Sequence, residues 1–357
     1  MTQAPLEEAM TRAGAVREAA AAPPMHFGNA REELRATLRS CALGNRSGLG
    51  RVLGAGPDLL DLLQRLSTAA MDGLSPGAGK PAVLTTPKGR IVERVTVHHL
   101  GEEGLLLVGG PDAGQRLIRH LDRFTFREQT GLSDITDSTC QLALIGPRAG
   151  DALQAAGLPL PSRHGVVNAD LHGIELRILG EDGLGSDGFS VVVQAEAAGR
   201  LWERLVRLVE GVEGRAAGTH ALESHRILRG IPSSPHELNE NHNPLEAGLR
   251  DSISFHKGCY VGQEVIARLD TYRKVSRALI GLELPAGCDA PEPGQELQIE
   301  GEALGRVTSS TIPPGWPHAV ALAYLKRKSS RPTVDLPTGR GTVRAKVIEL
   351  PFDLSDI

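Results

Sequence analysis

The stretch LGAGPDLLDLLQRL, residues 53–66, runs from an apolar strand through a Gly-Pro turn into an amphipathic helix. Proline in the first helical turn loses no hydrogen bond, because the first N–H groups of a helix have no partner within it. Glycine allows the sharp turn out of the strand. The same order recurs in VGGPDAGQRLIRHL (108–121) and LIGPRAGDALQAAG (144–157), and without Gly-Pro in VVVQAEAAGRLWERLV (191–206). We therefore predict a repeated strand-turn-helix design.

Further strands lie between these units. The segment AVLTTPKGRIVERVTVHHL (82–100) predicts a hairpin that turns at Pro87-Lys88-Gly89, and GLLLVG (104–109) predicts the next strand. Strands thus outnumber crossover helices, which favours largely antiparallel sheets and the α+β class over a doubly wound parallel sheet. After about residue 276, short apolar segments alternate with Gly/Pro turns. This pattern predicts a C-terminal β-barrel over residues 276–357, because closure removes exposed strand edges.

The length of 357 residues is too great for one ordinary core and suits two or three domains. Residues 1–28 are rich in alanine and proline, and we predict a poorly ordered leader there, with a short helix as the alternative. Ordered structure is expected from Asn29, which precedes Glu32 in a capping-box arrangement. Residues 29–275 are then predicted to form two interleaved α+β domains before the barrel.

Composition excludes several classes of function. The net charge of −4 supplies no global basic field for nucleic acid or membranes. No apolar run approaches the ~20 residues that span a bilayer, and the acidic N-terminal segment is unlike an export signal, so we expect a cytoplasmic protein. The four cysteines form no C-x-x-C pair, which argues against a zinc knuckle and against a disulfide framework. No metal site is predicted.

The stretch SFHKGCYVGQEVIARL (254–269) carries the candidate chemistry. A free thiol has a pKa near ~8.5 and becomes nucleophilic only when its thiolate is stabilised. Cys259 has two candidate stabilisers, the ammonium of Lys257 and the N-terminus of a helix expected to begin around Val261. The sequence therefore predicts a reactive thiol. The alternative is an inert buried cysteine, beside a Gln-Glu pair that only caps the helix.

These residues also carry a resemblance. KGCYVGQEVIAR, preceded by NPLEAGLRDSISF, resembles the signature of the YgfZ-type folate-binding proteins, a branch of the superfamily that contains the glycine-cleavage T-protein, an aminomethyltransferase. The segments TDSTCQLALIGPRAGDAL (136–153) and ALESHRILRGIPSSPHEL (221–238) look like further parts of that superfamily. The similarity spans roughly residues 46–350. It implies three domains arranged as a ring, with tetrahydrofolate in the central hole.

The resemblance also implies a site. Cys259 and Lys257 would carry the chemistry, and the residues expected to contact the folate are Arg226, Asp187, Ser186, Glu93, Tyr260, Gln263, Glu264 and Arg268. Arg268 belongs to a basic cluster with Arg273, Lys274 and Arg277 that we predict to hold the glutamate tail. Arg226 has a second interpretation, an interdomain salt bridge.

Two departures from the superfamily pattern concern catalysis. Ser186 stands where T-G-E-D-G-F has its glutamate, and Glu93 and Arg94 stand where aminomethyltransferases carry an aspartate pair. These changes argue against classical aminomethyl transfer. The resemblance to the YgfZ branch implies support of iron–sulfur cluster assembly or repair in client proteins, with Cys259 as the working thiol. Two alternatives remain open: tetrahydrofolate-dependent aminomethyl transfer or demethylation that uses Glu93, and a thiol redox or tRNA-modification accessory protein without folate.

Overall fold

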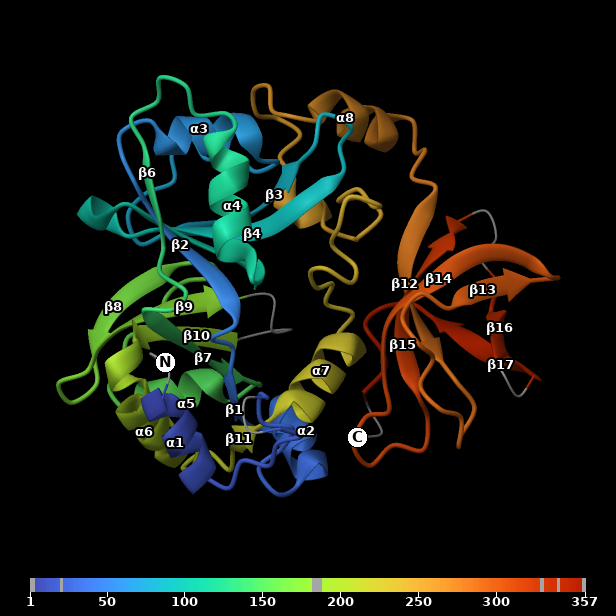
Figure 1. Cartoon of the computed structure of the whole chain (residues 1–357), viewed down its shortest axis with the longest axis horizontal. Coiled ribbons are helices and arrows are strands. Elements are labelled where there is room, and N and C mark those ends of the chain that lie inside the picture. The colour runs from blue at the N-terminus through green and yellow to red at the C-terminus, as the bar shows by residue number, and fades with distance from the viewer. Residues whose placement is uncertain (1–3, 20–21, 182–187, 328–330, 339–340, 355–357) are drawn as a thin grey trace.

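The computed structural model describes residues 4–19, 22–181, 188–327, 331–338 and 341–354. It confirms the predicted α+β class. Two sheets with flanking helices occupy one side of the molecule, and a closed six-stranded barrel occupies the other (Figure 1). Apart from one parallel pair, β1 with β11, the strands pair antiparallel.

The first sheet has the strand order β3-β4-β5-β2-β6. Its strands are β2 (Leu49–Ala55), β3 (Gly79–Thr85), β4 (Ile91–His99), β5 (Leu105–Pro111) and β6 (Gly131–Asp134). Helices α3 (Leu59–Leu66) and α4 (Ala113–Asp122) bury their leucines against one face of this sheet. The predicted hairpin at residues 82–100 is the β3–β4 pair.

The second sheet has the order β11-β1-β7-β10-β9-β8. Its strands are β1 (Ala42–Asn45), β7 (Thr139–Ile145), β8 (Val166–Asp170), β9 (Glu175–Glu181), β10 (Gly188–Gln194) and β11 (Arg215–Ala217). Its core contains side chains from α1 (Ala4–Arg12), α5 (Ala149–Ala155) and α6 (Ala198–Glu210). The free faces of the two sheets pack together through Leu106 and Val108 of the first sheet and Leu179 and Val192 of the second.

The poorly ordered leader predicted over residues 1–28 is wrong for the described part of that segment. Helix α1 buries Leu6 and Met10 fully in the core of the second sheet. The carbonyl of Pro5 lies so close to α6 that a Cβ on Gly199 would be 2.3 Å from it. The short-helix alternative is therefore correct. Burial of two large apolar side chains stabilises this helix, although its sequence shows only weak helical periodicity.

The Gly-Pro turns are confirmed as strand-to-helix connections. Gly56 follows β2 with φ +117°, and Gly146 follows β7 with φ +127°, a backbone region that residues with a Cβ rarely adopt. A Cβ at these positions would lie 2.1 Å from the carbonyl oxygen of Gln129 and 2.5 Å from that of Ser40. Both glycines are thus required by conformation and by close packing.

The barrel has the strand order β12-β15-β14-β13-β16-β17. Its strands are β12 (Arg277–Glu283), β13 (Glu296–Ile299), β14 (Glu302–Thr311), β15 (Val320–Lys326), β16 (Thr333–Thr338) and β17 (Gly341–Ile348). Two helices, α2 (Ala30–Arg39) and α7 (Thr219–Leu228), share a core with its strands and with Phe352. Helix α8 (Gln263–Thr271) lies just before β12 in the chain, near α3 and the barrel in the view of Figure 1.

Three short 3₁₀ turns complete the described elements, at Gly101–Glu103, Ala195–Ala197 and Arg250–Ser252. None of the helices in the described ranges is both long and apolar enough to cross a lipid bilayer. The long segment between α7 and α8 runs through the middle of the molecule and contacts both the first sheet and the barrel (Figure 1).

Candidate functional site

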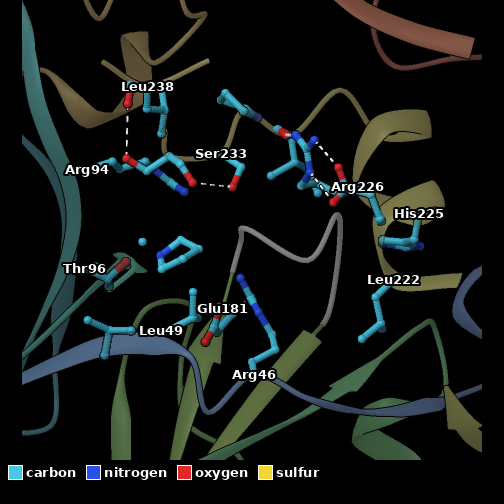
Figure 2. Close-up of a pocket in the computed structure, with 18 of the residues that line it drawn as sticks. Arg46, Leu49, Arg94, Thr96, Glu181, Leu222, His225, Arg226, Ser233 and Leu238 are labelled. Carbon is cyan, nitrogen blue, oxygen red and sulfur yellow. Dashed lines mark hydrogen bonds and ion pairs between the residues drawn. The ribbon is translucent and has the colours of Figure 1, made fainter. Parts of the chain in front are cut away.

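A cavity of about 360 Å³ lies where the two sheets, α7 and the segment after α7 meet. Figure 2 shows Thr96, Leu49 and Glu181 on one side of it and Leu222 and Arg226 of α7 on the other. Its apolar walls are formed by Leu49, Val108, Ile145, Leu222, Ile231 and Leu238. Apolar walls with a few polar groups are typical of a small-molecule site.

Strand β4 supplies one wall through its alternation. Residues two apart on a strand face the same side, so Arg94, Thr96 and His98 line the cavity together. The intervening Val95 and Val97 are buried in the core of the first sheet. The alternating sequence of this strand therefore places three polar side chains at the cavity.

Glu93 also lines the cavity, and its carboxylate is almost fully buried. Its Oε1 accepts from the backbone N–H groups of Arg94 at 3.2 Å and Gly110 at 3.3 Å. Its Oε2 accepts from the guanidinium of Arg116, a residue of α4. A buried carboxylate is stable only with such partners, and here a cation that the sequence did not indicate provides the balancing charge.

Arg226 reaches the cavity from α7 and is held between two acids. Its Nε lies 2.8 Å from Glu223, and its Nη1 lies 3.0 Å from Glu237. Burial lowers the pKa of Arg226, but hydrogen bonds and charges from the two acids outweigh it, so the net shift is upward. Glu237 is fully buried and also accepts from the hydroxyl of Ser309 in the barrel at 2.6 Å. Arg226 thus lines the cavity, but its ion pairs are local, to Glu223 of the same helix and to Glu237 in the segment that follows it. The contact with the barrel is made by Glu237, so an interdomain bridge by Arg226 itself stays a prediction.

Arg46 and Glu181 form an ion pair across the second sheet. Nη1 of Arg46 lies 3.3 Å from Oε2 of Glu181, and the carboxylate is also bound by Gln141 Nε2 at 3.1 Å. Both charged residues line the cavity. The fully buried Arg51 stabilises the turn that carries Arg46. Its guanidinium donates to the backbone carbonyls of Ser47 at 3.1 Å, Leu49 at 2.6 Å and Thr136 at 2.7 Å.

The predicted thiol lies elsewhere. Cys259 is exposed, which excludes the inert buried alternative, but it is not among the residues that line the central cavity. Helix α8 begins at Gln263, two residues later than expected, with Gly262 as its N-cap in the left-handed region. Cys41 and Cys140 are the buried cysteines, and Cys288 is half-buried.

The ammonium of Lys257 is hydrogen-bonded to backbone carbonyls of another segment. Its Nζ donates to the backbone carbonyls of Gln64 at 2.5 Å, Ser67 at 2.8 Å and Ala69 at 2.7 Å. An ammonium has three N–H groups, so none is left for the thiol. The expected stabilisation of the Cys259 thiolate by Lys257 thus has no hydrogen bond to support it and stays a prediction. Burial lowers the pKa of Lys257 to about 8. Its role is to fasten the cysteine loop to the end of α3.

The other motif residues also lie outside the cavity lining. Tyr260 is buried in a cluster with Leu245, Ile253 and Ile266, and burial raises its pKa to about 12. Gln263 and Glu264 stand in the first turn of α8, and Arg268 is exposed near its end. Ser186 and Asp187 lie outside the described residues.

The basic cluster predicted to hold a glutamate tail does not line the cavity either. The side chains of Arg268, Arg273, Lys274 and Arg277 are exposed around the end of α8 and the start of β12. Of the predicted ligand-binding residues, the structure brings together Glu93 and Arg226. Among the cavity residues that sequence reasoning missed are Arg46, Thr96, His98 and Glu181, and strand alternation could have indicated the two in β4.

Comparisons with known proteins find matches for both parts of the chain. The GCVT N-terminal domain matches residues 9–257, and the glycine cleavage T-protein C-terminal barrel domain matches residues 277–353. An Arabidopsis thaliana protein named "Putative transferase At1g60990, chloroplastic" is 31% identical over 85% of this chain and 69% of its own length. An aminomethyltransferase of Symbiobacterium thermophilum is 29% identical over 92% of this chain and 90% of its own.

A solved structure shares the fold. The glycine cleavage system aminomethyltransferase T from Bartonella henselae superposes with a TM-score of 0.84 at 22% identity, covering 98% of this chain and 97% of that one. The two family matches together account for both sheets and for the barrel. The chain therefore belongs to the glycine cleavage T-protein family.

Proposed function

We propose that this chain binds tetrahydrofolate or a closely related reduced folate in the central cavity. The observation that carries the proposal is the cavity itself, which combines apolar walls with the buried carboxylate of Glu93 and the Arg46–Glu181 pair. A folate needs an apolar slot for its flat pterin and hydrogen-bond acceptors for the N–H edge of that ring. The residues present fit both requirements.

The activity that the family membership supports is transfer of a one-carbon group from or to the bound folate. Relatives of this chain are named aminomethyltransferases. Glu93 is the acid placed to act in the cavity, because it is buried there as a carboxylate and can accept a proton or hydrogen bond from the ligand. Arg116 holds this carboxylate in position.

The experiment is a calorimetric titration with tetrahydrofolate, followed by a turnover assay with an aminomethyl donor. We expect binding by the wild type and loss of turnover in Glu93→Gln. The matched control is Glu103→Gln, which removes a more exposed acid that pairs with Arg177 outside the cavity lining. Absence of any heat of binding at millimolar folate contradicts the proposal. Binding without turnover supports the folate site and contradicts the transferase activity.

A second candidate function is favoured by a specific observation, the exposed thiol of Cys259 on the K-G-C-Y-V-G-Q-E segment. A thiol outside the small-molecule cavity is accessible to a protein partner. We propose for it the YgfZ-type role, support of iron–sulfur cluster assembly or repair in client proteins. A [4Fe–4S] cluster normally takes four cysteine ligands, so a cluster handled here would be shared with the client.

The test of this second function uses a strain that lacks the protein. Wild type and Cys288→Ser are expected to restore the activity of iron–sulfur enzymes, whereas Cys259→Ser is expected not to. Full rescue by Cys259→Ser removes this candidate. Rescue that needs Cys259 in a protein that binds no folate would instead support a thiol redox or tRNA-modification role.

A further inference from the structure

The hydrogen bonding of His98 defines which of its ring nitrogens is left as an acceptor. Nδ1 of His98 lies 2.8 Å from the backbone carbonyl oxygen of His164. A carbonyl oxygen can only accept, so Nδ1 carries the proton and Nε2 carries a lone pair. Within the described part of the chain, no hydrogen bond reaches Nε2. His98 lines the central cavity, so its ring is an oriented acceptor there.

The neutral state of this ring is maintained by its surroundings. His98 is 1% exposed, and burial lowers its pKa to about 4. The negative charge of Glu181 and the hydrogen bond to the carbonyl of His164 raise the pKa of His98, and the charge of the His164 ring lowers it, but burial has the largest effect. Near pH 7 the ring is therefore uncharged, and Nε2 remains available to accept a hydrogen bond.

Glu181 supplies a second acceptor in the lining of the same cavity, and its charge acts on the His98 ring. Its side chain is 16% exposed, and within the described ranges each of its oxygens is bound once, Oε2 by Arg46 and Oε1 by Gln141. A carboxylate oxygen accepts two hydrogen bonds, so each retains one further position. Glu93, by contrast, already receives three donors from the protein.

We propose that Nε2 of His98 and the carboxylate of Glu181 together accept hydrogen bonds from the N–H edge of a bound 2-amino-4-oxo-pterin, and so determine which ring the cavity takes. This assignment rests on the proposed folate binding. The edge of such a ring presents a ring N–H and an exocyclic amine side by side, and His98 and Glu181 each offer an acceptor in the lining of one cavity. The guanidinium of Arg46 and the hydroxyl of Thr96 are among the donors in the cavity lining that could bind the ring carbonyl.

The physical consequence is selectivity against rings that lack these donors. Leaving a buried acceptor unpaired costs more free energy than a hydrogen bond to it contributes. A site whose acceptors are placed for N–H groups therefore binds an analogue without those groups more weakly. Tetrahydrofolate should bind more tightly than its 2-desamino-2-methyl analogue, which replaces the exocyclic amine by a methyl group. A site that reads only ring shape would bind the two equally.

The experiment is calorimetric titration of both ligands into wild type, His98→Asn and Glu181→Gln. Asparagine keeps the donor to the carbonyl of His164 but removes the acceptor at Nε2. The matched controls are His99→Asn, the next residue along the strand, and Glu103→Gln. Circular dichroism melting of each protein verifies its fold, and Glu181 gives an independent reading if His98→Asn is unstable.

We expect tetrahydrofolate binding to weaken about 10-fold in His98→Asn and about 30-fold in Glu181→Gln, as for loss of a neutral and a charged acceptor. Both variants should discriminate less between the two ligands, and the controls should stay within about twofold of wild type. Wild-type affinity and discrimination in a folded Glu181→Gln overturn the assignment and leave the proposed function intact. A wild type that binds neither ligand overturns both.

Discussion

Replacement of Lys257 by methionine tests whether this lysine holds the cysteine loop or ionises the thiol. Methionine keeps most of the apolar stem and removes the ammonium that bonds three backbone carbonyls. A hydrogen bond from a charged donor contributes about 1.5–3 kcal/mol, and desolvation of the half-buried ammonium offsets a large part of three such bonds. We therefore expect Lys257→Met to lower the free energy of unfolding by about 2 kcal/mol.

The assay is urea denaturation at pH 7, paired with alkylation of the thiol as a function of pH. Lys80→Met is the matched control, because the Nζ of Lys80 bonds a single carbonyl, that of Ala70, in the same region. It should lose less than about 1 kcal/mol. In Lys257→Met we expect faster proteolysis of the loop around Cys259, with the midpoint of the alkylation profile equal to that of the wild type.

The opposite result would refute this reasoning. If Lys257→Met keeps the wild-type stability while the alkylation midpoint of Cys259 moves up by about one pH unit, the ammonium acts on the thiolate. The three carbonyls would then be incidental neighbours of a catalytic group.

Three further predictions follow from the cavity and its supports. His98, with a folded-state pKa of about 4, stays neutral while the unfolded chain takes up a proton below about pH 6.5, so acidification from pH 6.5 to 4 should cost up to about 3 kcal/mol through His98 in urea titrations. His98→Asn should remove this contribution and keep that of His242, whose pKa burial also lowers to about 4. Glu237→Ala should lower stability by about 3 kcal/mol or more, since it leaves Arg226 and Ser309 without a buried partner; a change below 1 kcal/mol by calorimetry would contradict this. Gly146→Ala should lower the melting temperature by several degrees, whereas Gly173→Ala, at φ +81° with no atom within 4 Å of its Cβ, should lower it less; equal shifts would show that packing against Ser40 contributes nothing.

The sequence by itself determined the local structure of this protein. Gly-Pro turns at the ends of β2 and β7, the Asn29 cap and the hairpin at residues 82–100 were all predictable, because backbone sterics and side-chain alternation act within a few residues. The α+β class and the barrel followed from the same patterns. The helix in the N-terminal segment was predicted only as an alternative, because its stability comes from burying Leu6 and Met10 against α6, a contact distant in sequence.

The site was decided by the tertiary structure. Arg46, His98, Glu181 and Arg226 come from separate elements, and they line one cavity only because two sheets pack face to face beside α7. Glu93 was predicted from its motif, but its partner Arg116 belongs to α4 and carried no signal. Lys257 stands two residues from Cys259, yet it bonds carbonyls 188 to 193 residues away. A hydrogen bond depends on distance in space, and packing sets that distance without regard to separation along the chain.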